Sequence, residues 1–266
     1  TCEENFNGYF GSSLGENFEP DELQARYGLS ADGFGYNWWT TDERWDISAP
    51  GYENENHRFG WQVEIDPDDP SKPPIKRTAL GRFKHEGMAI VIGRNNRAVA
   101  YMGDDQRFDY LYKFVSDKPY QWYLRRGLSP LDEGVLYVAQ FFGNGKGTWL
   151  PLVYGTGPLT KENGFADQGE VLIKARLAAD ALGATPMDRP EWTTVAPDGY
   201  AYVTCTNNTR RQPGDENAPN PRAENRWGHI IKWYDSYQHV GVNFDWDFFV
   251  LAGPGDGVDG STNSSS

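Results

Sequence analysis

Acidic and amide side chains gather in the polar loops of this chain, and one loop also carries a cysteine. Carboxylate and amide oxygens suit calcium or another hard cation, whereas a thiolate favours a transition metal. The sequence therefore predicts a metal site with mixed ligands. The candidate residues are Cys2, Glu3 and Glu4; Asp104, Asp105 and Asp109; Asn207 and Asn208; and Arg222, Glu224 and Asn225.

Two further carboxylates stand directly before strand-like segments. Glu86 is the second residue of the stretch HEGMAIV, and Glu191 is the second residue of PEWTTVA. Carboxylates that converge at one mouth repel one another and raise one another's pKa, unless cations neutralise them. We therefore expect Glu86 and Glu191 to face the same cation site.

The sequence lacks the short motifs of several common metal and phosphate sites. The chain has 4 His and no HxxxH, CxxC or HExxH spacing, which argues against zinc fingers and zincins. Neither DPDD nor DGVDG completes an EF-hand loop. The GNGKG stretch lacks the Walker spacing and a following helix, so a hairpin loop explains it better than a phosphate cradle.

Arg222 and Glu224 stand two residues apart in NPRAEN, on the same side of an extended segment. The arginine is placed to grip a phosphate bidentately while the glutamate holds a metal. Each candidate also has a simpler alternative. Arg222 and Glu224 would form a surface ion pair, Asp104 and Asp105 would stabilise a turn, and Cys2 would be a buried thiol or form a disulfide with Cys205.

The elements that must position these loops are short strands separated by Gly, Pro, Asn and Asp. The strands fall into three antiparallel units, and a fourth unit shows a polar loop at residues 2–5 and a return strand at residues 59–66. Helical patterns are confined to residues 20–27 and 171–182. The strands of the three units are expected at residues 88–93, 97–102 and 110–116; at 135–141 and 149–154; and at 192–196, 200–204 and 229–234.

We interpret the pattern as all-β, with one or two short helical insertions. Each unit is too small to bury both of its faces, and radial stacking of such units gives a β-propeller whose polar loops emerge on one face. A jelly roll or sandwich is the alternative. With about four units visible, we expect an incomplete set of blades over residues 1–252, followed by a disordered polar tail at residues 253–266.

Composition limits the partners. The formal net charge of −13 argues against nucleic acid, and no apolar run approaches the length of a membrane span. Two cysteines cannot form a disulfide framework. Because the sequence starts at Thr1 and shows no export signal, we expect a fragment or a processed chain.

Six ordered blocks of the sequence resemble the PhoX-type alkaline phosphatases, and the resemblance runs from Thr1 to about Trp233. These blocks are TCEENFNGYFG, LGRFKHEG, YMGDDQRFDYLYKFV, GKGTWLPL, LGATPMDRPEW, and TNN followed by NPRAENRWGHIIKW. The resemblance implies a six-bladed propeller with two iron ions and three calcium ions. It also implies broad hydrolysis of phosphate monoesters and a periplasmic or secreted location.

Matched block by block, the resemblance assigns metal ligation to six residues and phosphate binding to Arg222. Arg222 and Glu224 together are the expected catalytic residues. Cys2 resembles an iron-bound thiolate, and Glu86 resembles a metal-bridging carboxylate. The six expected ligands are Cys2, Glu3, Glu86, Asp104, Asp105 and Glu224.

We therefore expect a monomeric, metal-dependent phosphomonoesterase that acts on small phosphate esters, and we expect this chain alone to be inactive. Two alternatives remain. One is a non-catalytic propeller that displays aromatic residues such as Trp38 and Trp39 to a sugar or protein, although packing explains these residues too. The other is a calcium-dependent propeller that hydrolyses lactones or phosphotriesters.

Overall fold

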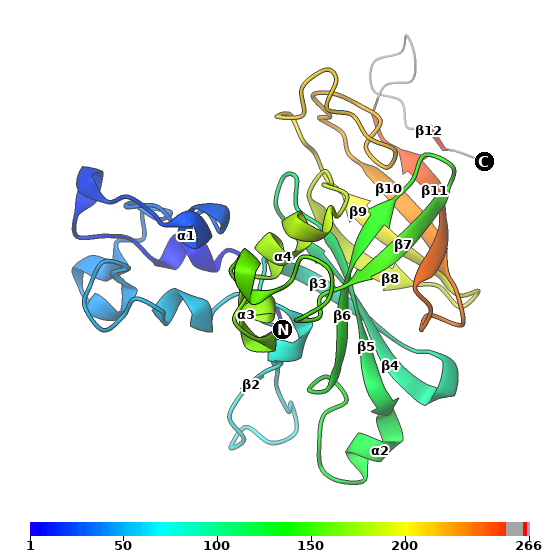
Figure 1. The fold of residues 1–266 in the computed structure, drawn as a ribbon, viewed down its shortest axis with the longest axis horizontal. Helices are drawn as coiled ribbons and strands as arrows, with labels where there is room; N and C mark the ends of the chain where they lie inside the picture. The colour runs from blue at the N-terminus through cyan, green and yellow to red at the C-terminus, as the bar shows by residue number, and fades with distance from the viewer. Residues whose placement is uncertain (254–262, 265–266) are drawn as a thin grey trace.

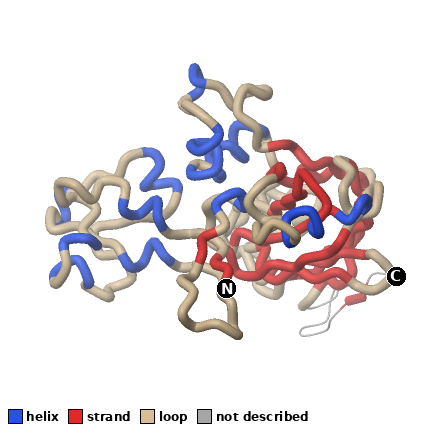
Figure 2. Tube along the Cα trace, turned by 90° about the horizontal axis from the view of Figure 1, so that it is seen from below, coloured by secondary structure: helices blue, strands red, loops and turns tan. Residues whose placement is uncertain are grey.

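The computed structural model describes residues 1–253 and 263–264. The chain is mostly β, with a strongly curved sheet on one side and a lobe of short helical turns and loops, residues 1–60, on the other (Figures 1 and 2). The loops at one end of the sheet meet the start of the lobe, and this junction positions the candidate site.

The main sheet is antiparallel throughout and has the order β3-β4-β5-β6-β7-β11-β10-β9-β8, with β12 paired to β11. Its strands are β3 (His85–Ile92), β4 (Arg97–Asp104), β5 (Leu111–Pro119), β6 (Gly134–Phe141), β7 (Lys146–Pro151), β8 (Pro190–Val195), β9 (Tyr200–Cys205), β10 (His229–Asp235), β11 (Asn243–Leu251) and β12 (Asn263–Ser264).

The predicted strands of the three units are present, but the units are not separate blades. Tyr112 of β5 is in register with Val138 of β6, and Gly147 of β7 is in register with Phe244 of β11. These pairings join all three units into one hydrogen-bonded sheet. Strand β11 was not predicted, because its sequence NFDWDFFVL mixes aspartates with aromatic residues.

The two edges of this sheet approach each other, so the sheet is nearly closed. The hydroxyl of Thr193 in β8 donates to the carbonyl of Tyr101 in β4 at 2.8 Å. Val99 and Tyr101 pack with Trp149 and Trp233 in the interior cluster. Ala100 and Met102 belong instead to the cluster that packs with the helices on the outer face. Strand β4 is therefore buried on both faces, which makes it a rigid support for the loop that follows it.

Four α-helices occur among the described residues: α1 (Glu22–Arg26), α2 (Tyr120–Leu124), α3 (Gln168–Ile173) and α4 (Ala175–Leu182). Helix α1 starts with a capping box, in which Asp21 accepts from the backbone of Gln24 and the Gln24 side chain bonds back. Both predicted helical stretches are therefore helical. The expectation of one or two insertions was too low, because the stretch at residues 168–182 divides into two helices and α2 was not predicted.

The N-terminal region contains little sheet. The predicted strand at residues 59–66 is reduced to β1 (Val63–Glu64), which pairs with β2 (Ile75–Lys76), and to an isolated bridge between Cys2 and Gln62. A short 3₁₀ helix at Glu55–Arg58 and the left-handed backbone of Gly60 (φ 93°) shorten it. The fourth predicted unit is therefore not a blade in the described part of the chain.

The predicted tail at residues 253–266 lies mostly outside the described residues, which include only Gly253 and β12 of it. Within the part of the chain that the structure describes, no helix combines the length and apolar character needed to cross a membrane.

Candidate metal centre

Three carboxylates from distant parts of the sequence meet where the lobe joins the sheet. One oxygen from each of Glu4, Glu86 and Asp105 lies within 4.8 Å of the other two. Glu4 follows the Cys2–Gln62 bridge, Glu86 lies near the start of β3, and Asp105 directly follows β4. We call this group the carboxylate cluster.

A β-bulge places Glu86 at this junction. His85 is in register with Asp104 and Met88 with Met102, so β3 contains one more residue than β4 between these two pairs. Bulges of this kind re-aim a side chain and are frequent beside functional sites. Neither the bulge nor its register is visible in the sequence pattern of β3.

Gly103 brings the start of β8 against the cluster. A Cβ on Gly103 would lie 2.2 Å from the carbonyl oxygen of Pro190, so only glycine permits this approach. The approach sets Arg189 beside Asp105, and its Nε and Nη2 each donate to a different carboxylate oxygen at 2.8 Å. Arg189 also forms an ion pair with Glu191 at 3.0 Å. The sequence pattern predicted Glu191 near this site but gave no signal for Arg189.

The cluster carries excess negative charge. Burial, together with the neighbouring Glu4, Asp105 and Glu191, raises the pKa of Glu86 to about 7. Burial, with Asp105 as the next cause, also raises the pKa of Glu191 above its usual range. Arg189 supplies one positive charge against four carboxylates. The donor set therefore fits a hard cation, which would neutralise the remaining charge.

Cys2 is not one of the three clustered ligands, although the charges of Glu4 and Glu86 act on its thiol, and it is held by a chain of hydrogen bonds. Its thiol donates to the side-chain oxygen of Gln62 at 3.4 Å, and the Gln62 amide lies 3.3 Å from Sγ and 3.1 Å from Nδ1 of His85. Nε2 of His85 lies 2.9 Å from the carbonyl of Gly81. Because Gln62 donates to Nδ1, the neutral ring carries its proton on Nε2.

Burial lowers the pKa of His85 to about 4, which keeps the ring neutral. Burial also raises the pKa of the Cys2 thiol. A bound cation would favour the thiolate, and Gln62 and His85 are placed to orient it, as outer residues do around metal ligands.

Glu3 points away from the cluster, unlike its neighbour Glu4. Its carboxylate accepts from the backbone amides of Gly60 and Trp61, each at 3.1 Å, and pairs with Lys76 at 2.7 Å. The structure thus gives Glu3 a role in anchoring the lobe. Glu4, a candidate loop residue that is not among the six expected ligands, belongs to the cluster.

Asp104 does not belong to the cluster, although its neighbour Asp105 does. It is fully buried and receives two hydrogen bonds from Arg176 of α4, at 2.7 and 2.5 Å, and one from the backbone amide of Lys84 at 3.1 Å. The neighbouring Asp109 pairs with Arg26 at 2.5 Å. These aspartates fix the loop that carries Asp105.

Arg222 and Glu224 lie in the long loop between β9 and β10. Arg222 donates to the carbonyl of Ala252, while Glu224 is exposed and has a left-handed backbone (φ 44°). Neither belongs to the carboxylate cluster found among the described residues. In the same loop, Asn207 accepts from Arg107, and the amide of Asn208 donates to the carbonyl of Asn225.

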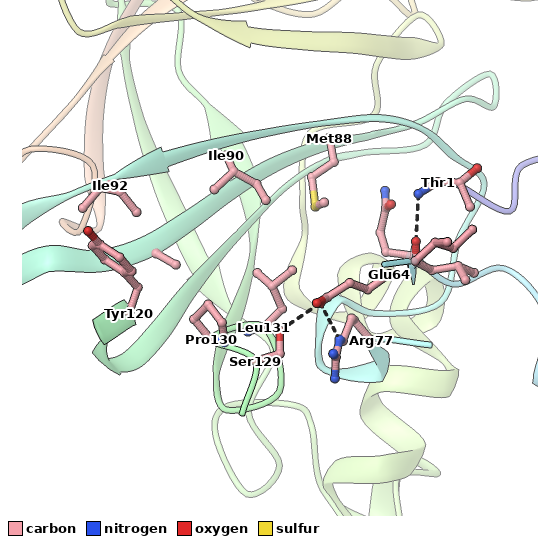
Figure 3. Close-up of a pocket in the computed structure, with 14 residues that line it drawn as sticks. Thr1, Glu64, Arg77, Met88, Ile90, Ile92, Tyr120, Ser129, Pro130 and Leu131 are labelled. Carbon is pink, nitrogen blue, oxygen red and sulfur yellow. Dashed lines mark hydrogen bonds and ion pairs between the residues drawn. The ribbon is translucent and has the colours of Figure 1, made fainter. Parts of the chain in front are cut away.

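A separate groove of about 420 Å³ lies between β3 and the segment at residues 129–131 (Figure 3). Met88, Ile90 and Ile92 form its apolar wall. Its charged residues are already paired, because Glu64 accepts from Ser129 at 3.0 Å and from Arg77 at 2.8 Å. The groove therefore lacks the three converging carboxylates that distinguish the cluster.

The family model described as alkaline phosphatase PhoX matches residues 1–266, and the chain belongs to this family. The fold is similar to the solved structure titled Pseudomonas fluorescens PhoX in complex with vanadate, a transition state analogue, with a TM-score of 0.87 and 46% sequence identity. That match covers 95% of this chain and 45% of the other, so this chain spans less than half the length of the solved protein. Among curated proteins, none matches the chain.

Proposed function

We propose that this chain forms part of a metal-dependent phosphomonoesterase, and that the carboxylate cluster holds the metal. The observation that carries this proposal is the meeting of Glu4, Glu86 and Asp105 within 4.8 Å in a chain of the PhoX family. The vanadate complex of the similar PhoX structure supports chemistry on phosphate esters. The wider composition, two iron ions and three calcium ions in a six-bladed propeller, rests on the family resemblance.

The protein's own residues prepare the site. Arg189 holds Asp105 by a fork of two hydrogen bonds, and the buried pair of Asp104 and Arg176 fixes the backbone next to it. Gln62 and His85 orient Cys2. When bound, the cations supply positive charge to the phosphate oxygens as negative charge develops on them.

Phosphate gripping by Arg222, with Glu224 as a further ligand, is part of the same proposal. Arg222 is partly exposed and lies in a loop joined to the site by Arg107 and Asn207 at 3.2 Å. Export to the periplasm or the medium also belongs to the proposal, on the family resemblance. Detection of the intact protein in an extracytoplasmic fraction would support it, and confinement to the cytoplasm would contradict it.

The activity is tested with p-nitrophenyl phosphate on the intact protein, before and after exhaustive chelation. We expect hydrolysis that chelation abolishes and that iron and calcium restore. Hydrolysis that survives chelation would contradict the proposal. A panel containing a lactone and a phosphotriester separates this activity from the other hydrolytic chemistry expected of calcium-dependent propellers.

The thiol is tested by Cys2→Ala, with Cys205→Ala as the matched control, because Cys205 is buried in the interior cluster. We expect Cys2→Ala to lower bound iron and turnover together, and Cys205→Ala to retain both. Full iron content and turnover in Cys2→Ala would remove the thiol from the site.

A further inference from the structure

Three aromatic side chains stand exposed at alternate positions of one loop in the lobe. Phe34, Tyr36 and Trp38 are 49%, 51% and 42% exposed. The residues between and before them, Gly33, Gly35 and Asn37, have left-handed backbones with φ of 50°, 78° and 59°. The rings nevertheless lie next to one another: the centroids of Phe34 and Tyr36 are 6.3 Å apart, and those of Tyr36 and Trp38 are 5.8 Å apart. We call these three residues the aromatic platform.

The platform is held from below by the segment that follows Glu4. Tyr9 stacks on Trp38 with a centroid distance of 4.9 Å and an angle of 16°. The ring of Phe34 lies on Gly8 so closely that a Cβ there would be 2.3 Å from it. Two exposed aromatic rings are thus fixed against the lobe, which lowers the entropy cost of stacking a ligand on them.

Two short links join Phe34 of the platform to residues of the carboxylate cluster. Gly8, whose carbonyl accepts from the amide of Phe34 at 3.2 Å, is in the turn Phe6–Tyr9, which starts two residues after Glu4. In the second link, Nζ of Lys84 lies 5.9 Å from the ring centroid of Phe34. The carbonyl of Lys84 accepts from the amide of Asp105 at 3.0 Å. The Phe34 end of the platform is therefore the part linked to the cluster.

We propose that the aromatic platform binds the planar ring of an aryl or nucleotide phosphomonoester while its phosphate occupies the metal centre. This inference rests on the proposed function and adds a substrate class to it. Flat π-surfaces accept any aromatic ring, so the platform favours aromatic esters without selecting one base. Nζ of Lys84, which donates to Gln106 at 2.8 Å, adds positive charge 5.9 Å from the ring centroid of Phe34.

The kinetic test compares adenosine 5′-monophosphate, which has a planar base, with glycerol phosphate, which has none. In the intact protein, we expect Tyr36→Ala and Trp38→Ala to lower kcat/KM for the nucleotide roughly tenfold more than for glycerol phosphate. Trp38→Phe should restore most of the loss. The control is Tyr234→Ala, because Tyr234 is an equally exposed aromatic residue on β10. Equal losses for both esters in the platform variants would overturn the proposal.

The binding test uses adenosine, which has no phosphate and needs no metal. Saturation-transfer nuclear magnetic resonance on the metal-free chain should show binding to the wild-type chain and to Tyr234→Ala. The signal should fall in Tyr36→Ala and Trp38→Ala. Binding that is unchanged in both platform variants, or preferred binding of a sugar without a base, overturns the platform. Absence of hydrolysis of both esters by the metal-loaded wild-type protein would instead refute the proposed phosphatase function.

Discussion

At the scale of single residues, Glu86 shows how burial and neighbouring carboxylates raise the pKa of a glutamate. Its pKa of about 7 in the folded chain lies above the ordinary value of 4.5. The folded state therefore holds this proton more tightly than the unfolded state. Ionisation of Glu86 must then reduce stability as the pH rises from about 4.5 to about 7.

The variant Glu86→Gln removes this ionisation from the metal-free chain. We expect its stability relative to the wild type to be higher at pH 8 than at pH 5, because only the wild type must ionise Glu86 in the folded state. Urea unfolding of both proteins at the two pH values measures the difference. The control is Glu64→Gln, since Glu64 is already paired with Arg77. An equal difference at both pH values would contradict the assigned electrostatics.

Residue types and spacing anticipated that Glu86, Glu191 and Asp105 share one neighbourhood. They did not distinguish Glu3 from Glu4, because neighbouring residues of an irregular segment point to opposite sides according to its backbone. Here the bridge between Cys2 and Gln62 and the two backbone amides bound by Glu3 settle the direction. Arg189 was also missed, because its partner Asp105 is 84 residues away.

At the scale of elements, the close approach of β8 to β4 assembles one side of the site. The variant Gly103→Ala adds a Cβ where the Pro190 carbonyl lies at 2.2 Å, so β8 must shift. We expect a loss of about 1–3 kcal/mol in the free energy of unfolding and a weaker affinity for metal. Chemical unfolding and metal titration measure these effects.

Gly143→Ala is the matched control for this prediction. A Cβ at Gly143 meets no heavy atom within 4 Å, and its backbone is not left-handed. We expect its stability and metal affinity to stay close to those of the wild type. If Gly103→Ala also behaved like the wild type, β8 would not position the site.

The strand pattern predicted nine strands that the structure contains in whole or in part. These are β1 and the eight strands from β3 to β10. Turn residues and short runs of apolar residues are local signals, and the apolar run is strong in segments such as RAVAYM. Pairing between units is not local. The registers of β5 with β6 and of β7 with β11 depend on the curvature of the whole sheet, so the predicted blades became one sheet.

At the scale of the whole molecule, burial of neutral histidines should make the protein sensitive to acid. Burial lowers the pKa of His57, His85 and His229 to about 4. Below pH 6.5 the unfolded chain takes up protons that the folded chain does not accept. The contribution of these histidines to stability must therefore fall as the pH decreases from about 6.5 to about 4, opposite in sign to that of Glu86.

For each of the two fully buried rings, His85 and His229, the loss is up to about 3 kcal/mol. Urea unfolding of the wild type and of His85→Gln between pH 7 and pH 4 tests this prediction. We expect the wild type to lose more stability than His85→Gln over this range, because only the wild type must keep the His85 ring neutral in the folded state. An equal loss in both proteins would show that the His85 ring is not buried as a neutral group.

Glu4, Glu86 and Asp105 are proposed to hold the metal. Comparison of substitutions at the neighbouring residues Glu3 and Glu4 tests this most directly. Elemental analysis for iron and calcium should be made on the wild-type protein, on Glu4→Gln and on Glu3→Gln. We predict that the wild type contains stoichiometric metal, that Glu4→Gln loses most of it, and that Glu3→Gln keeps it while losing the contact with Lys76. Retention of metal by Glu4→Gln together with its loss from Glu3→Gln would contradict the account.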